Sequence, residues 1–159
     1  MKKLKRIDLK KMQNIHQVMN DQELAEMLGG YIQNTDWACL FNMMEYIGAG
    51  SAYTWHTTYI GWGQQVSPTG IPTGYFDVML EHAGKEFNYT SGAPTGLTKD
   101  YNQIAIWGWP DGTQHSVIVR KAPDAYGNIE VYDPSYGGGR VFTVGNQTGY
   151  FVGVYNIKK

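Results

Sequence analysis

The sequence predicts an α+β domain, in which a helical N-terminal lobe precedes an antiparallel β-sheet. The composition is the first indication, because 20 glycines, 12 tyrosines and 5 tryptophans in 159 residues are typical of a turn-rich β or α+β body. Apolar residues at helical spacing lie shortly before residue 50, and strand-like runs fill the second half. The length suits one domain with a hydrophobic core of its own.

The helical half rests on two segments. Asp36 is suited to cap a helix over Trp37–Ile47, which Gly48 would end. One stripe of this helix should face the core, since its apolar residues recur at helical spacing: Leu40, Met43, Met44 and Ile47. Residues 48–74 are rich in Gly, Thr and Ser and are expected to form a loop with short turns. A second short helix is expected over Phe76–His82.

The sheet is predicted in the C-terminal half. Residues 84–103 show little periodicity and are expected to be irregular. The expected strands are Gln103–Trp109, His115–Lys121, Asn128–Asp133, Val141–Val144 and Tyr150–Ile157. Two turn-forming segments, 110–112 and 124–128, separate the first three strands, so these should pair as antiparallel neighbours.

Charge and hydropathy exclude several classes of protein. The formal net charge of −1 gives no electrostatic basis for binding nucleic acid or anionic lipid. No apolar run approaches the ~20 residues that span a bilayer, so no stable membrane insertion is expected. No Sec-type signal peptide is visible, because polar residues follow the basic N-terminus. The single cysteine shows that the fold does not depend on internal disulfides.

Residues 1–30 differ in character from residues 31–159, because they contain no aromatic residue and end in Gly29-Gly30. Asn20 can cap a short helix, with Glu23 at the capping-box position. Its apolar face would consist of Leu24, Met27 and Leu28, and the two glycines would stop it. From the pattern alone, this segment can be an amphipathic helix that packs on its own domain.

The same segment resembles a double-glycine leader, the export signal of bacteriocins and related small secreted proteins. The resemblance rests on Met19, Glu23, Leu24 and Met27 before the cleavage site Gly29-Gly30. It implies that a cysteine peptidase domain fused to an ABC transporter cuts after Gly30 during export. A leader of residues 1–30 would then precede a mature domain of residues 31–159. The precursor would be cytoplasmic and the mature protein secreted.

Cys39 is the only cysteine, and its surroundings suggest a nucleophile. It falls in the first turn of the expected helix, where the helix dipole lowers the pKa of a thiol. His115 opens one expected strand as a candidate base, and Asp133 closes the next as its orienting carboxylate. Gln33 can donate to a developing oxyanion. No cofactor is implied, and no metal site is expected, because one Cys with scattered His and Asp offers no ligand pair at the usual spacing.

The order of these four residues resembles the papain-like cysteine peptidase superfamily. The stretches around His115 (QHSVIV) and Asp133 (IEVYDP) are most similar to bacterial members, including the peptidases that process bacteriocins. The resemblance implies a papain-like fold, with the cysteine-bearing helix packed on the sheet. It also implies that Cys39 is the nucleophile, His115 the base, Asp133 the orienting residue and Gln33 the oxyanion donor. The substrate would be a peptide or protein.

Other interpretations remain open at this level. A lone cysteine is often an inert, buried apolar side chain. The fold can be kept without catalysis, as a secreted binding module or a bacteriocin-like toxin. His56 lies in an aromatic setting that suits either a structural role or the wall of a substrate groove. A retained leader can also lie across the cleft and block it, and the double glycine suits self-cleavage.

Overall fold

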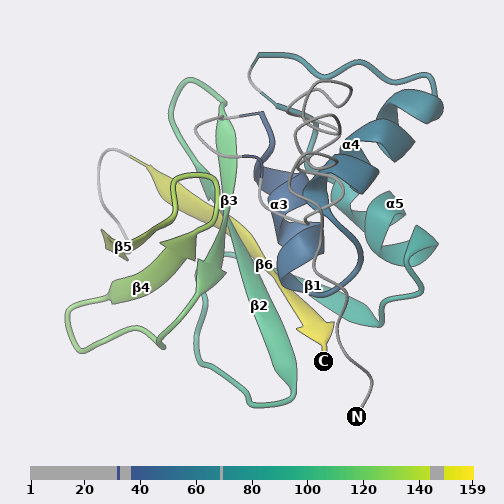
Figure 1. Cartoon of the computed structure of the whole chain (residues 1–159). Coiled ribbons are helices and arrows are strands. Elements are labelled where there is room, and N and C mark those ends of the chain that lie inside the picture. The colour runs from purple at the N-terminus through teal and green to yellow at the C-terminus, as the bar shows by residue number, and fades with distance from the viewer. Residues whose placement is uncertain (1–31, 33–36, 69, 144–148) are drawn as a thin grey trace, which may run out of the picture.

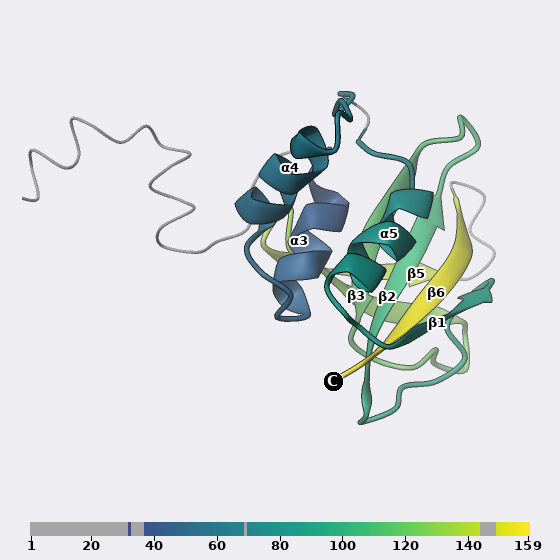
Figure 2. The same ribbon diagram turned by 90° about the vertical axis from the view of Figure 1, so that its right-hand side faces the viewer.

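The structure is a computed structural model that describes residues 32, 37–68, 70–143 and 149–159. It is a mixed α+β fold, as predicted, in which helices pack on an antiparallel sheet (Figure 1). The helices of the described part are α3 (Cys39–Tyr46), α4 (Ala52–Gly61) and α5 (Gly74–His82). They lie together on one face of the sheet, as the view in Figure 2 shows.

The sheet has six strands in the order β1-β6-β2-β3-β4-β5, and every neighbouring pair is antiparallel. Their bounds are β1 (Phe87–Ser91), β2 (Tyr101–Gly108), β3 (Gln114–Val119), β4 (Asn128–Asp133), β5 (Gly138–Thr143) and β6 (Tyr150–Lys158). The ladder between β3 and β4 is short and contains only Ile118↔Tyr132 and Val119↔Val131. The first four residues of β3 therefore have no β4 partner, and the sheet is open there.

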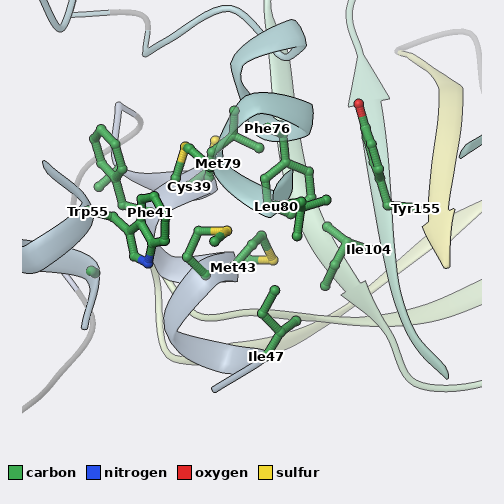
Figure 3. Close-up of a cluster of buried hydrophobic side chains, with 14 of the residues drawn as sticks. Cys39, Phe41, Met43, Ile47, Trp55, Phe76, Met79, Leu80, Ile104 and Tyr155 are labelled. Atoms are coloured by element: carbon green, nitrogen blue, oxygen red, sulfur yellow. The ribbon is translucent and has the colours of Figure 1, made fainter. Parts of the chain in front are cut away.

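The core lies on both faces of the sheet because side chains alternate along each strand. Ile104 and Ile106 of β2 and Ile118 of β3 face the helices, where they join the buried side chains of α3, α4 and α5. Figure 3 shows Cys39 among these apolar side chains. Residues of opposite parity, such as Ala105, Trp107 and Val117, form a second cluster on the other face.

The start of α3 differs from the prediction. The helix begins at Cys39 and its N-cap is Ala38, which makes no side-chain capping bond, so the expected start at Trp37 is wrong. The carbonyl of Ala38 accepts the first helical hydrogen bond, from the N–H of Asn42 at 3.0 Å. The proposed cap, Asp36, lies outside the described residues. Cys39 is thus the first helical residue.

Two segments that were expected to be irregular contain regular structure. Residues 52–61, inside the expected 48–74 loop, form α4, which Ser51 caps by accepting a hydrogen bond from the N–H of Thr54 at 3.1 Å. Burial of Trp55 and Tyr59 stabilises a helix whose Thr, Gly and aromatic residues are weak helix formers. Within 84–103, residues 87–91 form the edge strand β1, which pairs with β6. Tertiary contacts outweighed local propensity in both places.

The remaining predictions hold closely. The expected strand Asn128–Asp133 coincides with β4, and β2, β3, β5 and β6 overlap their expected ranges. The helix expected at Phe76–His82 is α5. The proposed leader, residues 1–30, lies outside the described residues. No helix in the described part of the chain is long and apolar enough to cross a membrane.

Candidate active site

Cys39 occupies the N-terminus of α3 and lies against the sheet. Its side chain is nearly buried, with 7% of the residue exposed. As the first helical residue, it sits where the N–H groups of a helix have no carbonyl partner within the helix and the dipole is positive. This position favours a thiolate over a thiol.

His115 and Asp133 form a buried pair on neighbouring strands. Nε2 of His115 lies 2.9 Å from Oδ2 of Asp133, and the two residues are 5% and 0% exposed. The second carboxylate oxygen of Asp133 accepts a hydrogen bond from the N–H of Ser135 at 3.1 Å. The carboxylate therefore holds the imidazole ring in one orientation through a single ring nitrogen.

The other side of the His115 ring meets the thiol of Cys39, and the two side chains are hydrogen-bonded. Because Nε2 faces Asp133, Nδ1 is the nitrogen that is left for the sulfur. The contact occurs at the start of β3, where no β4 residue pairs with the strand. Because β4 does not pair with this part of β3, the N-terminus of α3 can reach the His115 ring.

The electrostatics of the site favour an ion pair. Burial raises the pKa of the Cys39 thiol, but the hydrogen bond and charge of His115, with hydrogen bonds from Ser116, bring it below its usual value. Burial lowers the pKa of His115, whereas the bonds and charges of Asp133 and Cys39 raise it, to about 10 overall. Both shifts favour a thiolate beside an imidazolium over a neutral thiol beside a neutral ring.

A buried amide connects α3 to the segment that carries the site carboxylate. Asn42 is fully buried and uses all its hydrogen-bonding groups. Its Oδ1 accepts from the N–H of Ile32 at 2.8 Å, and its Nδ2 donates to the Ile32 carbonyl and to Oγ of Ser135, both at 2.9 Å. The N–H of Ser135 in turn donates to Asp133, so hydrogen bonds connect Ile32, Asn42 and Ser135 to the site carboxylate.

Replacing Asn42 by alanine should reduce the free energy of unfolding by about 2–4 kcal/mol, because the buried groups of Ile32 and Ser135 lose their partner. Urea unfolding followed by tryptophan fluorescence measures this change. The matched control is Asn88→Ala, since Asn88 is exposed and its Oδ1 accepts a single bond from Asn156. An equal loss in the two variants would show that burial of the Asn42 network contributes nothing.

Two hollows open beside the site. One has a volume of about 360 Å³ and is lined by Trp37, His56, Val66, Ser67 and Pro68. The other, about 330 Å³, lies between residues 67–73 of the α4–α5 connection and residues 111–114 of the β2–β3 turn. Trp37 lies two residues before Cys39, and Gln114 directly precedes His115. Both hollows therefore adjoin the segments that carry the thiol and the imidazole.

His56 belongs to the wall of the first hollow. Its ring lies 5.0 Å from that of Trp37 and 5.6 Å from that of Phe41, between centroids. This aromatic wall gives the hollow a largely apolar lining. Two other aromatic rings, those of Trp109 and Tyr136, lie near His115, each with its centroid 6.4 Å from that of the imidazole.

Of the residues singled out in the sequence, the structure brings Cys39, His115 and Asp133 together. Gln33, Gly29 and Gly30 lie outside the described residues. Asn42, Ser116 and Ser135 were missed. Asn42 stands out in the sequence as a single polar residue between apolar ones, but this does not reveal its partners, and Ser116, which follows two polar residues, gave no such signal. No cluster of three or more His, Cys, Asp or Glu suited to a metal ion occurs among the described residues.

Comparison with protein families and with curated protein sequences finds no match to this chain.

Proposed function

We propose that this protein is a cysteine hydrolase of the papain-like type, which cleaves a peptide or amide bond. The observation that carries the proposal is the alignment of three groups from distant parts of the chain: the Cys39 sulfur, the His115 ring and the Asp133 carboxylate. A nucleophile paired with a base, and a base oriented by a third group, is the arrangement that covalent hydrolysis requires.

The chemistry follows from the ion pair. The Cys39 thiolate attacks the substrate carbonyl carbon, and the carbonyl oxygen becomes an oxyanion. The N–H of Cys39, at the helix start, can donate to that oxygen, and Gln33 is the second donor that the resemblance implies. The His115 imidazolium then gives its proton to the leaving amine, which departs and leaves a thioester. Water hydrolyses the thioester with neutral His115 as the base.

A catalytically inactive binding module is the main alternative. It is favoured when the thiol lies out of reach of the histidine and no groove adjoins it. Here the two side chains are hydrogen-bonded, and hollows adjoin the segments that carry them. The geometry therefore supports a hydrolase over a module that acts only by surface contact.

The test uses p-nitrophenyl acetate, an activated ester that needs no specific subsite. Wild-type protein should release a burst of about one p-nitrophenolate per molecule, with the acetyl group on Cys39 by mass spectrometry. Cys39→Ala should give no burst while keeping a cooperative unfolding transition. A peptide library should show new termini only with the wild type. A burst or cleavage that persists in Cys39→Ala would exclude the proposed mechanism.

We further propose that the mature domain is secreted after an ABC transporter with a peptidase domain removes residues 1–30. The double glycine supports this, because residues without side chains can thread a narrow peptidase groove. Incubation of the full chain with such a peptidase domain should produce a new N-terminus at Tyr31. Replacement of Gly29 and Gly30 by valine should prevent it. Release in the absence of that peptidase, and only with Cys39 intact, would instead indicate self-processing.

A further inference from the structure

Ser116 follows His115 on β3 and is 1% exposed. Because side chains alternate along a strand, Ser116 shares the face of Ile118, which is directed at the helices. His115 shares the opposite face with Val117. Since α3 packs on β3, Ser116 lies beneath the start of that helix. It approaches Cys39 from a different face of the strand than the imidazole does.

The polar groups of Ser116 lie beside the sulfur of Cys39. Its hydroxyl oxygen is fully buried and makes no hydrogen bond of ordinary geometry within the described part of the chain. The hydroxyl and the backbone N–H of Ser116 nevertheless lie close enough to Cys39 to lower the pKa of its thiol. The N–H is available because this part of β3 has no β4 partner.

The two donor groups of Ser116 favour one ionisation state of the sulfur over the other. A neutral thiol is a weak acceptor, and a buried hydroxyl that meets only a weak acceptor costs about 1–3 kcal/mol. A thiolate accepts charge-assisted hydrogen bonds, which are about twice as strong as neutral ones. The two donors of Ser116 are therefore best satisfied when Cys39 carries a negative charge.

We propose that Ser116 is a catalytic residue that stabilises the Cys39 sulfur as a thiolate. The inference rests on the proposed function and adds a donor to the sulfur that does not depend on the protonation state of His115. In the hydrolysis of the thioester, neutral His115 takes a proton from water and the resulting hydroxide adds to the carbonyl carbon. The C–S bond then breaks, its electron pair passes to sulfur, and the carboxylic acid leaves. Ser116 donates to the sulfur at that step.

The experiment measures the pH dependence of Cys39 alkylation by iodoacetamide in the full chain, together with the ultraviolet absorbance of the thiolate. Ser116→Ala should raise the midpoint for thiolate formation by about one pH unit, because a hydrogen bond to a charged group is lost. The rate at high pH should stay the same or rise, since a less stabilised thiolate is a stronger nucleophile.

Ser116→Thr and Ser116→Val form the matched pair, because their side chains have the same shape and only threonine has a hydroxyl. Threonine should keep the midpoint near that of the wild type, and valine should shift it as alanine does. A midpoint that is unchanged in Ser116→Ala, or equally raised in the threonine and valine variants, would overturn the assignment of the hydroxyl.

The experiment also separates this inference from the proposed function. If wild-type Cys39 titrates like an ordinary thiol, and like the thiol of His115→Ala, the hydrolase proposal fails. If the midpoint for thiolate formation lies well below that of an ordinary thiol in the wild type, and is the same in Ser116→Ala, only the role of Ser116 fails.

Discussion

Replacing His115 by alanine is expected to lower the rate of Cys39 alkylation by iodoacetamide near pH 6 by about 100-fold, because an unassisted thiol is almost wholly protonated there. In the wild type, burial opposes ionisation of the thiol, but the hydrogen bond and charge of His115 lower its pKa and so favour the thiolate. The measurement is the second-order rate of alkylation, followed by mass spectrometry, across the pH range.

The shape of the pH profile adds a second readout. The wild-type rate should rise on the acidic side of the usual thiol pKa and then level off. Loss of the His115 proton at about pH 10 should leave the rate high or raise it, since a less stabilised thiolate is a stronger nucleophile. The His115→Ala profile should show a single step near the usual thiol value of about 8.5. His82→Ala is a suitable control, since His82 lies at the far end of α5. Coincident profiles for wild type and His115→Ala would exclude an ion pair.

Replacing Asp133 by alanine is expected to reduce the free energy of unfolding by about 3–5 kcal/mol near neutral pH, because it leaves a buried imidazolium without its carboxylate. Asp133 is fully buried and contacts both His115 and the N–H of Ser135. Asp133→Asn is the matched control, since an amide oxygen can accept one of these bonds in the same shape. It should cost less than alanine in chemical denaturation.

This loss should depend on pH with a defined sign. The pKa of His115 is raised from 6.5 to about 10 in the folded protein, so folding favours the protonated ring. Its contribution to stability is fully present below pH 6.5 and disappears as the pH rises through about 10. The difference in stability between wild type and Asp133→Ala should therefore shrink above pH 10. A difference that grows with pH would contradict the protonated state of His115.

The sequence predicted those parts of the fold in which local pattern and tertiary role agree. The apolar stripe of α3 and the alternation of β4 were visible because each element buries one face. The segment 52–61 carried no such signal, since its cap at Ser51 and the burial of Trp55 and Tyr59 become apparent only once the helix is packed. The edge strand β1 was missed because four of its five residues are exposed and it depends on β6 for pairing.

The same distinction applies to the site. Cys39, His115 and Asp133 could be selected because their side-chain chemistry is informative by itself. Asn42 and Ser116 could not, because their roles arise from partners far away in the chain. Asn42 and Ser135 are 93 positions apart, and Ser116 acquires its partner only when α3 packs on β3.

The strand order has a consequence for how the molecule is made. β6 lies between β1 and β2, yet it follows every other strand along the chain. A nascent polypeptide emerging from the ribosome therefore cannot complete the sheet until β6 has been synthesised, and β1 has no neighbour before then. Until β6 has emerged, the sheet is unfinished, and unpaired strand edges are exposed to chaperones and to self-association.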